Sequence, residues 1–481
     1  MAESWVLEEM RTVDLKDART NARLREVLSQ LGARPTASIP TACGGHAEMT
    51  AAYRLFDNEE ATFERILKPH ADATRERMGA QKTALVVQDT TEIDVTRPKQ
   101  QVDGAGPLDG GPRRGMFLHL LHVFTPEGTP LGTLVATPWA REEGPNTPAS
   151  RAERAAIPIE NKESYRWLET IRKARAEAVH CPDTQIISVC DSEADIYEVL
   201  TEAQAEPRRI DWIVRGCQNR ALQCKAGETV THYVRECVME QPVLFCQTIN
   251  VRGRDPKVAC ETRGRRQARV SRQACVEIRS ARVTLRPPWR PTGKLPEIAI
   301  NVVLVREVNA PKDDEPVEWL LLTSLPIDNA DQVRQVIQYY CVRWMIEILF
   351  RVLKSGCRVE KRRFERLERL QSCLAVYLIV AWRTLYVCRL ARSCPDISCE
   401  VVFEPEEWKP VWKISRHSDP PPNPPALGEM TIMVAQLGGY IPRKGSVPGP
   451  QTLWIGLQRT HDFAICWKNF GPGYENETED V

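Results

Sequence analysis

Four side chains between residues 339 and 356 combine charge and spacing in a way that suits phosphate chemistry. Tyr340, Arg343, Glu347 and Lys354 follow the pattern Y-x2-R-x3-E-x6-K. On a continuous α-helix, which turns by about 100° per residue, they fall within an arc of roughly 60° on one face. That face offers one carboxylate flanked by two cations and a phenol. A carboxylate that holds a divalent metal ion beside a phosphate backbone would need such neighbours, so Glu347 is a candidate metal ligand.

The opposite face of this stretch, which we call the signature segment (339–356), is apolar. Val342, Ile346, Leu349 and Leu353 recur there at helical spacing. We therefore expect one α-helix over the whole signature segment, with its apolar stripe docked on a hydrophobic core.

Two further carboxylates follow apolar runs that are typical of buried strands. TALVVQDTT ends near Asp89, and QIISVCD ends in Asp191. Reactive groups gather at the carboxyl ends of strands in α/β sheets, so both acids could converge with Glu347. Two divalent ions need hard oxygen ligands of this kind. Each aspartate also has a structural alternative, because Asp89 could be a turn or cap residue and Asp191 an N-cap.

The elements that must position these acids form an α/β pattern. Apolar strand patterns alternate with helical ones, and we expect a mixed sheet. Between 216 and 316 the pattern is β-like without clear helices, which predicts an inserted β-subdomain. The expected strands lie at about 84–91, 116–124, 129–137, 185–191 and 209–216, and a long helix at 160–178.

Helical patterns flank this core on both sides. An amphipathic helix over 14–31 and a second helical pattern over 46–66 predict a small N-terminal domain, and further helices follow the signature segment to about residue 395. A length of 481 residues agrees with two or three domains. We expect a helical domain at 1–66, the catalytic domain at 67–372 and a helical C-terminal domain at 373–481.

Composition restricts the function classes. The net charge of +1 conceals a basic stretch, since residues 252–290 carry twelve Lys/Arg against three Asp/Glu. The 16 cysteines include no CxxC pair, which argues against zinc and disulfides. The most apolar run, 373–382, is about half the ~20 residues that span a membrane. We expect a cytoplasmic protein that does not cross the membrane.

Several motifs, in this order, resemble the DDE transposases of the bacterial insertion-sequence-four family, and its transposon-five branch most of all. They are DTT at 89–91, VCDSEADIYEVL at 189–200 and the signature segment. The likeness extends over nearly the whole chain through RTNARL (19–24), AAYRLFDN (51–58), ENKESYRWLE (160–169), VEWLLLTS (317–324), LGGY (437–440) and LWIGLQ (453–458).

The resemblance implies an RNase H-like catalytic core with an inserted β-subdomain, a DNA-binding N-terminal domain and a dimerising C-terminal domain. It assigns Asp89, Asp191 and Glu347 as a catalytic triad for two Mg²⁺ ions, for which Mn²⁺ can substitute. The implied activity is cut-and-paste transposition with a hairpin intermediate. The implied partners are inverted-repeat transposon ends, target DNA and a second copy of the chain in a synaptic complex. The implied location is the bacterial nucleoid.

The resemblance also assigns DNA contacts. Trp319 matches a tryptophan that stacks on a flipped base, which a tight hairpin requires. Tyr340, Arg343 and Lys354 match residues that hold the phosphate of the displaced nucleotide and the backbone nearby. From the residues alone, Trp319 would be a core tryptophan on an apolar strand.

Other DNA contacts are expected from single arginines. Arg19 and Arg23 match an end-binding helix, although surface arginines without a role would look the same. Arg215 and Arg220 could line the DNA channel. The acid Asp195, which follows Asp191 closely, is expected to remain solvated.

Two alternative functions remain open at this point. A nuclease with the same core would cut without strand transfer, and it would need neither Trp319 nor end-specific N-terminal helices. A non-catalytic DNA-binding regulator would have lost a triad acid, whereas all three are present. Residues 396–425 and the acidic end of the chain have no counterpart in the family pattern, which leaves the C-terminal dimer contacts open.

Overall fold

The computed structural model describes residues 4–143, 153, 157–207, 210–223, 231–251, 270–290, 293–312, 314, 316–443 and 445–472. Within this part of the chain ten strands form one sheet. They are β1 (Thr83–Asp94), β2 (Gly106–Pro107), β3 (Arg114–Phe124), β4 (Pro130–Trp139), β5 (Gln185–Cys190), β6 (Asp211–Arg215), β7 (Phe245–Val251), β8 (Arg272–Leu285), β9 (Ile298–Glu307) and β10 (Glu318–Thr323).

The order of the strands is β2-β3-β1-β5-β6-β10-β9-β8-β7, and β4 also pairs with β3. Strands β1, β5 and β6 are parallel neighbours, whereas the other pairings are antiparallel. The mixed sheet predicted from the sequence is therefore confirmed.

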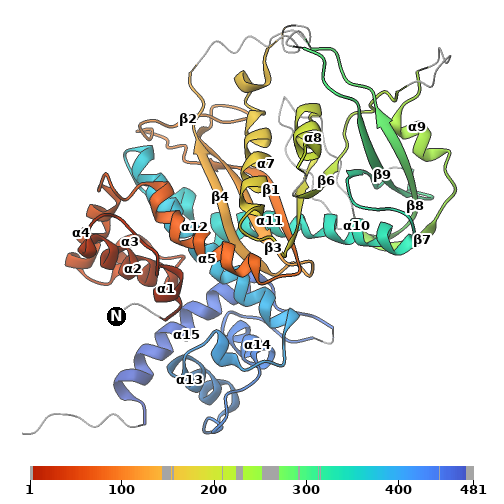
Figure 1. Cartoon of the computed structure of the whole chain (residues 1–481). Helices are drawn as coiled ribbons and strands as arrows, with labels where there is room; N and C mark the ends of the chain where they lie inside the picture. The colour runs from red at the N-terminus through yellow and green to blue at the C-terminus, as the bar shows by residue number, and fades with distance from the viewer. Residues whose placement is uncertain are drawn as a thin grey trace, which may run out of the picture.

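Helices lie on both faces of the sheet and at both ends of the chain (Figure 1). They are α1 (Ser4–Glu9), α2 (Ala18–Ala33), α3 (Ile39–Cys43), α4 (His46–Phe56), α5 (Phe63–Gly79), α7 (Tyr165–Ala178), α8 (Tyr197–Gln204), α9 (Val234–Met239), α10 (Ala330–Val342), α11 (Trp344–Arg351), α12 (Leu367–Ser393), α13 (Pro405–Arg416), α14 (Leu427–Leu437) and α15 (Pro450–Phe470).

The alternation of side chains along the strands creates two hydrophobic cores. In β1, Leu85 and Val87 pack with residues of α10, α11 and α12. Ala84 and Val86 point to the other face and pack with residues of α7 and α8. The side-chain parity of a strand position therefore decides which set of helices it meets.

The N-terminal helices begin where the sequence provides caps. Helix α2, expected over 14–31, is confirmed, and its N-cap Asp17 accepts a hydrogen bond of 2.8 Å from the backbone of Thr20. The single helical pattern expected over 46–66 is wrong, because α4 ends at Phe56. Helix α5 then starts separately after the N-cap Thr62.

A buried acid anchors α1 to the rest of the protein. Glu9 accepts hydrogen bonds from His70 (2.5 Å) and from both terminal nitrogens of Arg77 (2.8 and 3.0 Å). The other ring nitrogen of His70 accepts the backbone N–H of Thr133, so the ring donates toward Glu9. Burial acts to raise the pKa of Glu9, but His70 and Arg77 lower it to about 2.

The signature segment is not the single α-helix that its spacing predicts. Helix α10 ends at Val342, a turn at Arg343 follows, and α11 continues from Trp344 to Arg351. Residues Val352–Gly356 then form a π-turn, which is wider than an α-helical turn. The apolar stripe is nevertheless buried as expected, because Ile346, Leu349 and Leu353 are fully covered.

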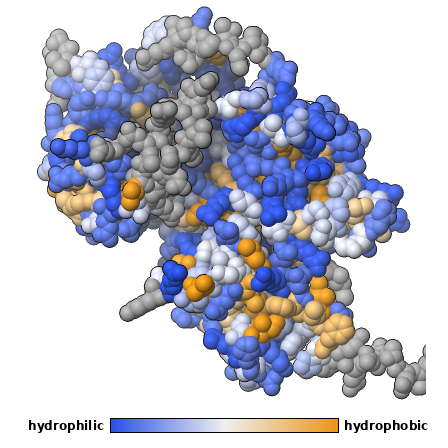
Figure 2. All heavy atoms as spheres, turned by 180° about the vertical axis from the view of Figure 1, so that it is seen from behind, coloured by the Kyte–Doolittle hydropathy of each residue, from blue (hydrophilic) through white to orange (hydrophobic). Residues whose placement is uncertain are grey.

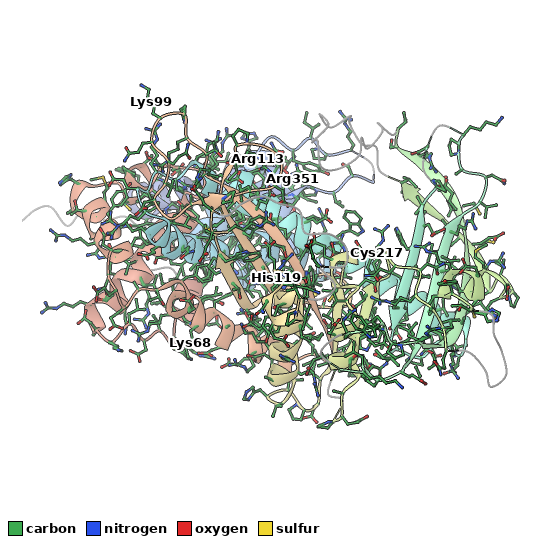
Figure 3. All side chains as sticks on the ribbon, turned by 90° about the horizontal axis from the view of Figure 1, so that it is seen from above. Lys68, Lys99, Arg113, His119, Cys217 and Arg351 are labelled. Carbon is green, nitrogen blue, oxygen red and sulfur yellow. The ribbon has the colours of Figure 1, made fainter. Side chains whose placement is uncertain are left out.

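The inserted strands β7, β8 and β9 extend the central sheet beyond β10. Seen from above, they lie at one end of the molecule and the N-terminal helices at the other (Figure 3). The expectation of no helix in 216–316 is wrong, because α9 packs on β8 and β9 there. A helix of six residues is too short for its apolar periodicity to be recognised in a sequence.

The long helix α12 lies at the centre of the molecule. It contacts α2 and α5 of the N-terminal region, β4 of the sheet, and α14 and α15 of the C-terminal region. By length and composition α12 could cross a membrane, but 78% of its most apolar window is buried inside the protein. Such burial is typical of a core helix.

Candidate active site

Asp89, on β1, lies beside Asp191, which directly follows the parallel strand β5. The register of β1 and β5 pairs Gln88 with Cys190, so the next residue on each strand path is one of these acids. The strand does not end at Asp89 as expected, because β1 continues to Asp94 in pairing with β3 alone. Asp89 is thus a strand residue and neither a turn nor a cap.

The parity of the strands directs four of the predicted site residues to one face. Asp89 and Asp191 follow, by two positions, residues that pack on the side of α10 and α11. Arg215 of β6 and Trp319 of β10 have the same parity as their neighbours Ile213 and Leu321 in that core. The sheet therefore presents these residues toward the signature segment.

Arg343 connects the sheet to the signature segment. Its guanidinium donates to Oδ2 of Asp89 at 3.0 Å and to Oε1 of Glu347 at 2.7 Å. The side chain of Arg343 is only 5% exposed. Burial opposes its charge, but Tyr340, Asp89 and Glu347 keep its pKa above the usual value. One cation thus lies between two of the three acids.

Asp89 carries more negative charge around it than this cation balances. Burial, and then repulsion by Asp191, raise the pKa of Asp89 from 3.8 to about 7. Arg343 and the backbone N–H of Thr90, which donates to Asp89 Oδ1 at 2.8 Å, act in the opposite direction. Asp191 also performs its alternative role, because its Oδ1 accepts the N–H of Glu193 at 2.8 Å and caps the 3-10 turn that follows.

The chemistry of these donors fits a hard divalent cation. Asp89 and Asp191 supply carboxylate oxygens, which Mg²⁺ prefers, and a cation would relieve the repulsion between them. Among the described residues no three acidic, histidine or cysteine side chains form a complete metal-binding group, and Arg343 stands between Asp89 and Glu347. The Glu347 side chain is 44% exposed, so of these three acids it has the most freedom to change partners.

Tyr340, Trp319 and Arg215 lie beside the acids. The rings of Trp319 and Tyr340 are 5.9 Å apart and tilted. Burial raises the pKa of Tyr340 despite the opposing charges of Arg343 and Arg215. Arg215 donates to the backbone oxygen of Glu318 at 3.3 Å. Trp319 is half-buried, so it packs on the core and still reaches the surface.

Lys354 and the two N-terminal arginines lie elsewhere. Burial lowers the pKa of Lys354, whose charged neighbours are Glu360, Glu92, Arg113 and Asp94. The π-turn, which a helical arc could not anticipate, carries Lys354 to this second group. Arg19 and Arg23 are on α2, where Arg23 donates to Glu26 at 2.7 Å. Their contact with DNA stays a prediction.

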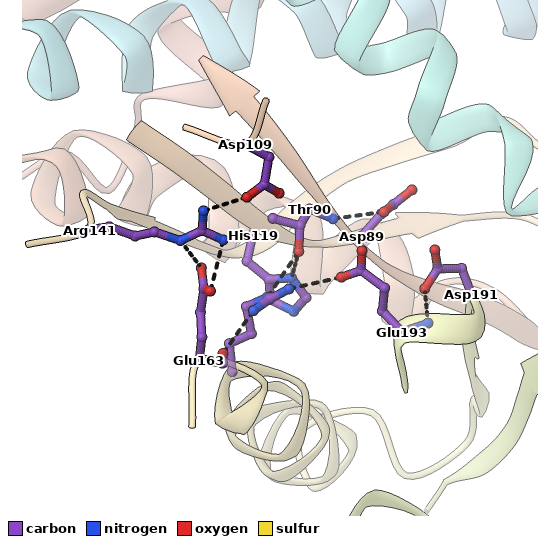
Figure 4. A network of polar contacts seen from close by, with 9 residues as sticks. Asp89, Thr90, Asp109, His119, Arg141, Glu163, Asp191 and Glu193 are labelled. Atoms are coloured by element: carbon purple, nitrogen blue, oxygen red, sulfur yellow. Dashed lines mark hydrogen bonds and ion pairs between the residues drawn. The ribbon is translucent and has the colours of Figure 1, made fainter. Parts of the chain in front are cut away.

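Arg166 of α7 is a residue that the sequence did not single out. It donates to Thr90 Oγ1 at 3.2 Å and to Glu193 Oε2 at 2.9 Å; Figure 4 labels these two partners beside Asp89 and Asp191. Thr90 and Glu193 are the residues whose backbone N–H groups bind Asp89 and Asp191. Arg166 therefore lies on the opposite face of the sheet and reaches each acid through one intervening residue, Thr90 for Asp89 and Glu193 for Asp191. Its only signal was its place within ENKESYRWLE.

A second overlooked residue is Trp344, directly after Arg343. Its side chain is 43% exposed, and the guanidinium of Arg343 lies 4.8 Å from its ring centre. A cation–π contact of this kind helps to hold the guanidinium in place. An aromatic residue beside the arginine of the signature pattern was the available clue.

Two expectations about charged residues are wrong. Asp195 is not solvated but buried, and its Oδ2 accepts the N–H groups of Cys217 and Gln218 at 2.8 Å each. Arg220 does not line a channel, because it is 8% exposed and paired with Asp195. This pair fixes the loop after β6 to the turn after Asp191.

The basic stretch 252–290 falls partly outside the described residues, at 252–269. In its described part most arginines have protein partners. Arg272 pairs with Glu307 and Asp314, Arg282 with Asp328, and Arg290 with Glu198. Arg272 thus pairs within the insertion, and Arg282 and Arg290 pair it with residues outside it, which is the structural explanation of a basic stretch.

Comparison with known protein families gives three matches along the chain. The transposase DNA-binding family matches residues 2–61, the transposase DDE domain residues 166–382, and the transposase Tn5 dimerisation domain residues 379–470. A solved structure titled as a cryo-EM structure of the piggyBac transposase synaptic complex with hairpin DNA is similar at 11% identity and a TM-score of 0.36. The similar region covers 81% of this chain and 72% of the piggyBac transposase chain.

The succession of a DNA-binding, a DDE and a dimerisation domain defines a DDE transposase with an RNase H-like core. Within that class the chain belongs to the Tn5-like transposases, in agreement with the insertion-sequence-four resemblance. It is thus a DNA-binding enzyme that dimerises, of a family that uses divalent metal ions. The domain bounds 1–66, 67–372 and 373–481 stay predictions.

The dimerisation match carries exposed apolar side chains. Apolar atoms gather on the lower part of the face in Figure 2, where the C-terminal helices lie. Contiguous apolar surface of this kind marks interaction sites. The exposed large apolar residues of this part include Ile432, Ile441, Val447, Ile465 and Phe470.

Proposed function

We propose that the chain performs cut-and-paste transposition, in which it frees a DNA segment through hairpin ends and joins it to target DNA. One observation carries the proposal. Asp89 and Asp191 lie side by side, and Arg343 links Asp89 to Glu347, in a chain with DNA-binding and dimerisation domains. Two Mg²⁺ ions, or Mn²⁺ in their place, would supply an activated water or 3′-hydroxyl and stabilise the leaving oxygen.

Asp89, Asp191 and Glu347 would hold these ions. Arg343 now shares its charge between Asp89 and Glu347. When those carboxylates are balanced by cations, its guanidinium becomes available to a DNA phosphate, which it can bind through two parallel hydrogen bonds. Arg343 would therefore change from a partner of the acids to a partner of the substrate.

Trp319 and Tyr340 support the hairpin step. A hairpin requires a base outside the stack, and an aromatic ring at the surface beside the acids can receive it. Trp319 is half-buried and fixed against Tyr340, so its ring is held in place before DNA arrives. Lys354 and Arg215 would hold the DNA backbone on either side of the flipped base.

The remaining assignments concern the partners. Arg19 and Arg23 would contact the inverted-repeat ends from α2. Two copies of the chain would pair the two ends in a synaptic complex before joining them to target DNA. The reaction would take place on DNA in the bacterial nucleoid.

The direct test uses labelled duplexes that carry the inverted repeats flanking the gene. With Mg²⁺, we expect 3′-hydroxyl nicks, then hairpins, then joined products on denaturing gels. Glu347→Gln should give none of these while it still binds the duplex. Cleavage that never leads to joining would instead identify a nuclease, and cleavage by Glu347→Gln would remove the triad assignment.

The stacking role has its own variant. Trp319→Ala should still nick but should form few hairpins. Trp289→Ala is the matched control, because Trp289 is 76% exposed on the insertion. Equal hairpin yields in both variants would contradict the assignment of Trp319.

A further inference from the structure

A basic cavity lies between the end of the signature segment and the C-terminal helix α15. Its volume is about 530 Å³. Arg351 and Arg358 line it from the signature segment and the residues just after it, and Arg459 lines it from α15. The remaining polar lining includes Ser355, Gln451 and Gln458, and no carboxylate is among the lining residues.

The three arginines differ from most others in the protein. Among the described residues, the Arg351 side chain donates one hydrogen bond, to the amide oxygen of Gln451 at 3.5 Å, and Arg459 donates to the backbone oxygen of Leu437 at 2.5 Å. Within the described part of the chain none of the three forms an ion pair, whereas Arg272, Arg282 and Arg290 all do. The cavity therefore concentrates positive charge that no carboxylate among the described residues pairs with.

Two backbone irregularities shape this wall of the cavity. The π-turn Val352–Gly356 brings Ser355 into the lining. Arg358 has a φ of 51°, in the left-handed region that residues other than glycine rarely adopt. Gly356 packs tightly on α15, since a Cβ there would lie 3.0 Å from the Trp454 ring. Irregular backbone of this kind is frequent at functional sites.

We propose that this cavity binds backbone phosphates of the DNA strand that leaves the acidic site. The inference rests on the proposed function, because it needs DNA at Asp89, Asp191 and Glu347. Arg351 follows Glu347 by four residues on α11, which is about 6 Å along a helix axis. At about 3.4 Å per nucleotide, a strand held at the acids reaches the cavity within about two nucleotides. Guanidinium groups bind phosphate oxygens in a fork.

The cavity would also give α15 a role in substrate binding. Arg459 lies within the dimerisation match 379–470, while Arg351 lies within the DDE match 166–382. A strand in the cavity would contact both matches of one chain. The dimerisation region would then contribute directly to DNA affinity.

The test removes two of the three charges. In Arg358→Asn/Arg459→Gln the asparagine suits the positive φ, so the backbone is expected to keep its conformation. The slope of log affinity against log salt for the end duplex should become shallower by about two. Methylphosphonates placed about two nucleotides from the cleaved bond should weaken binding of the parent protein but not of the variant.

The matched control is Arg416→Gln/Lys468→Gln, which removes two charges of the C-terminal helices outside the cavity. Arg416 pairs with Glu429, and Lys468 is exposed on α15. The control should keep the parental salt slope. If the cavity variant does not fold, as judged by its unfolding midpoint, the single variant Arg351→Gln should lower the slope by about one.

Three outcomes would overturn the proposal. The salt slope of the cavity variant could equal the parental slope, or the salt slope of the control could become as shallow as that of the cavity variant. Pyrophosphate could instead raise the unfolding midpoint of the parent alone while the slopes stay equal, which would identify a free phosphate ligand. Asp89→Asn, measured alongside, separates the two proposals. If it still cleaves, the proposed function fails, and if only the slopes fail to change, the cavity alone is refuted.

Discussion

Two buried acid clusters in this protein have opposite electrostatic balance. Glu9, which anchors α1, accepts hydrogen bonds from His70 and from both terminal nitrogens of Arg77, and its pKa falls to about 2. Asp89, on the sheet, has Asp191 beside it and shares Arg343 with Glu347, and its pKa rises to about 7. Burial alone would raise both pKa values.

The cluster around Glu9 is suited to stabilise the fold, whereas the cluster around Asp89 is suited to bind a cation. At Glu9 the chain supplies all the positive charge that the acid needs. At Asp89 it supplies less, which leaves a site whose stability improves when a cation arrives from outside. Strongly perturbed acids in such surroundings are candidates for function.

The largest expected effect is the loss of the Glu9 anchor. Glu9→Gln leaves Arg77 and His70 without their charged partner, which should cost about 3 to 5 kcal/mol of folding stability. The midpoint of thermal unfolding should drop by several degrees, while cleavage by the folded protein at 25 °C persists. Glu59→Gln, at an exposed position, is the control. An unchanged midpoint would mean that the anchor is not stabilising.

The next effect is on catalysis rather than stability. Asp191→Asn should reduce cleavage of end DNA on the order of 10³-fold, because the asparagine amide cannot replace a charged metal ligand. The affinity for the duplex and the unfolding midpoint should change little. Asp183→Asn, an exposed aspartate just before β5, should cleave normally. Cleavage by Asp191→Asn near the parental rate would reduce this acid to its capping role.

A third effect has the opposite sign at the two clusters. The folded-state pKa of Asp89 is raised from 3.8 to about 7, so this acid makes the metal-free protein lose stability as pH rises from 4 to 7. A shift of that size is worth roughly 4 kcal/mol at most, and the lost Arg343 contact offsets part of it. Asp89→Asn should therefore unfold at a higher denaturant concentration than the parent at pH 8 without metal.

Glu9 behaves in the reverse manner, because its pKa is lowered from 4.5 to about 2. The stability that it contributes is complete above pH 4.5 and is lost as pH falls toward 2. Denaturant titrations of Asp89→Asn at pH 5 and pH 8, and of Glu9→Gln at pH 3 and pH 5, measure both signs. If Asp89→Asn is less stable than the parent at pH 8, the two clusters do not differ as argued.

The smallest effect concerns Arg166, which supports Asp89 and Asp191 from behind. Arg166→Gln should lower cleavage about 10- to 100-fold, as is typical of residues that orient metal ligands. The Mg²⁺ concentration for half-maximal activity should rise with it, and Arg166→Lys should recover part of the loss. Arg172→Gln on the same helix α7, at a surface pair with Glu202, is the control. A slower reaction with unchanged Mg²⁺ dependence would contradict a positioning role.

The sequence predicted the sheet and the family well, because both depend on patterns that repeat locally. Apolar runs located β1, β3, β4, β5 and β6, and their parity explains why Asp89 and Arg215 share a face. The triad acids were named from motif order. The short helix α9 and the break between α4 and α5 were missed, since tertiary packing decides elements of that length.

The surroundings of the site could not be predicted in the same way. Arg166 reaches Thr90 and Glu193 across more than 25 residues of sequence, and Asp195 finds Arg220 in another loop. Such partners depend on how the elements pack. The π-turn Val352–Gly356 breaks helical periodicity, so an ideal helical arc could not give the charged neighbours of Lys354, which are Glu360, Glu92, Arg113 and Asp94.

Helix α12 has a mechanical consequence. The DDE match ends at residue 382 and the dimerisation match begins at 379, so the junction falls inside one uninterrupted helix, Leu367–Ser393. No hinge separates the part that cuts from the part that pairs. If two copies pair through the dimerisation match, α12 would hold the two proposed active sites at a fixed distance from each other. Insertions would then leave a constant length of duplicated target sequence on either side of the element.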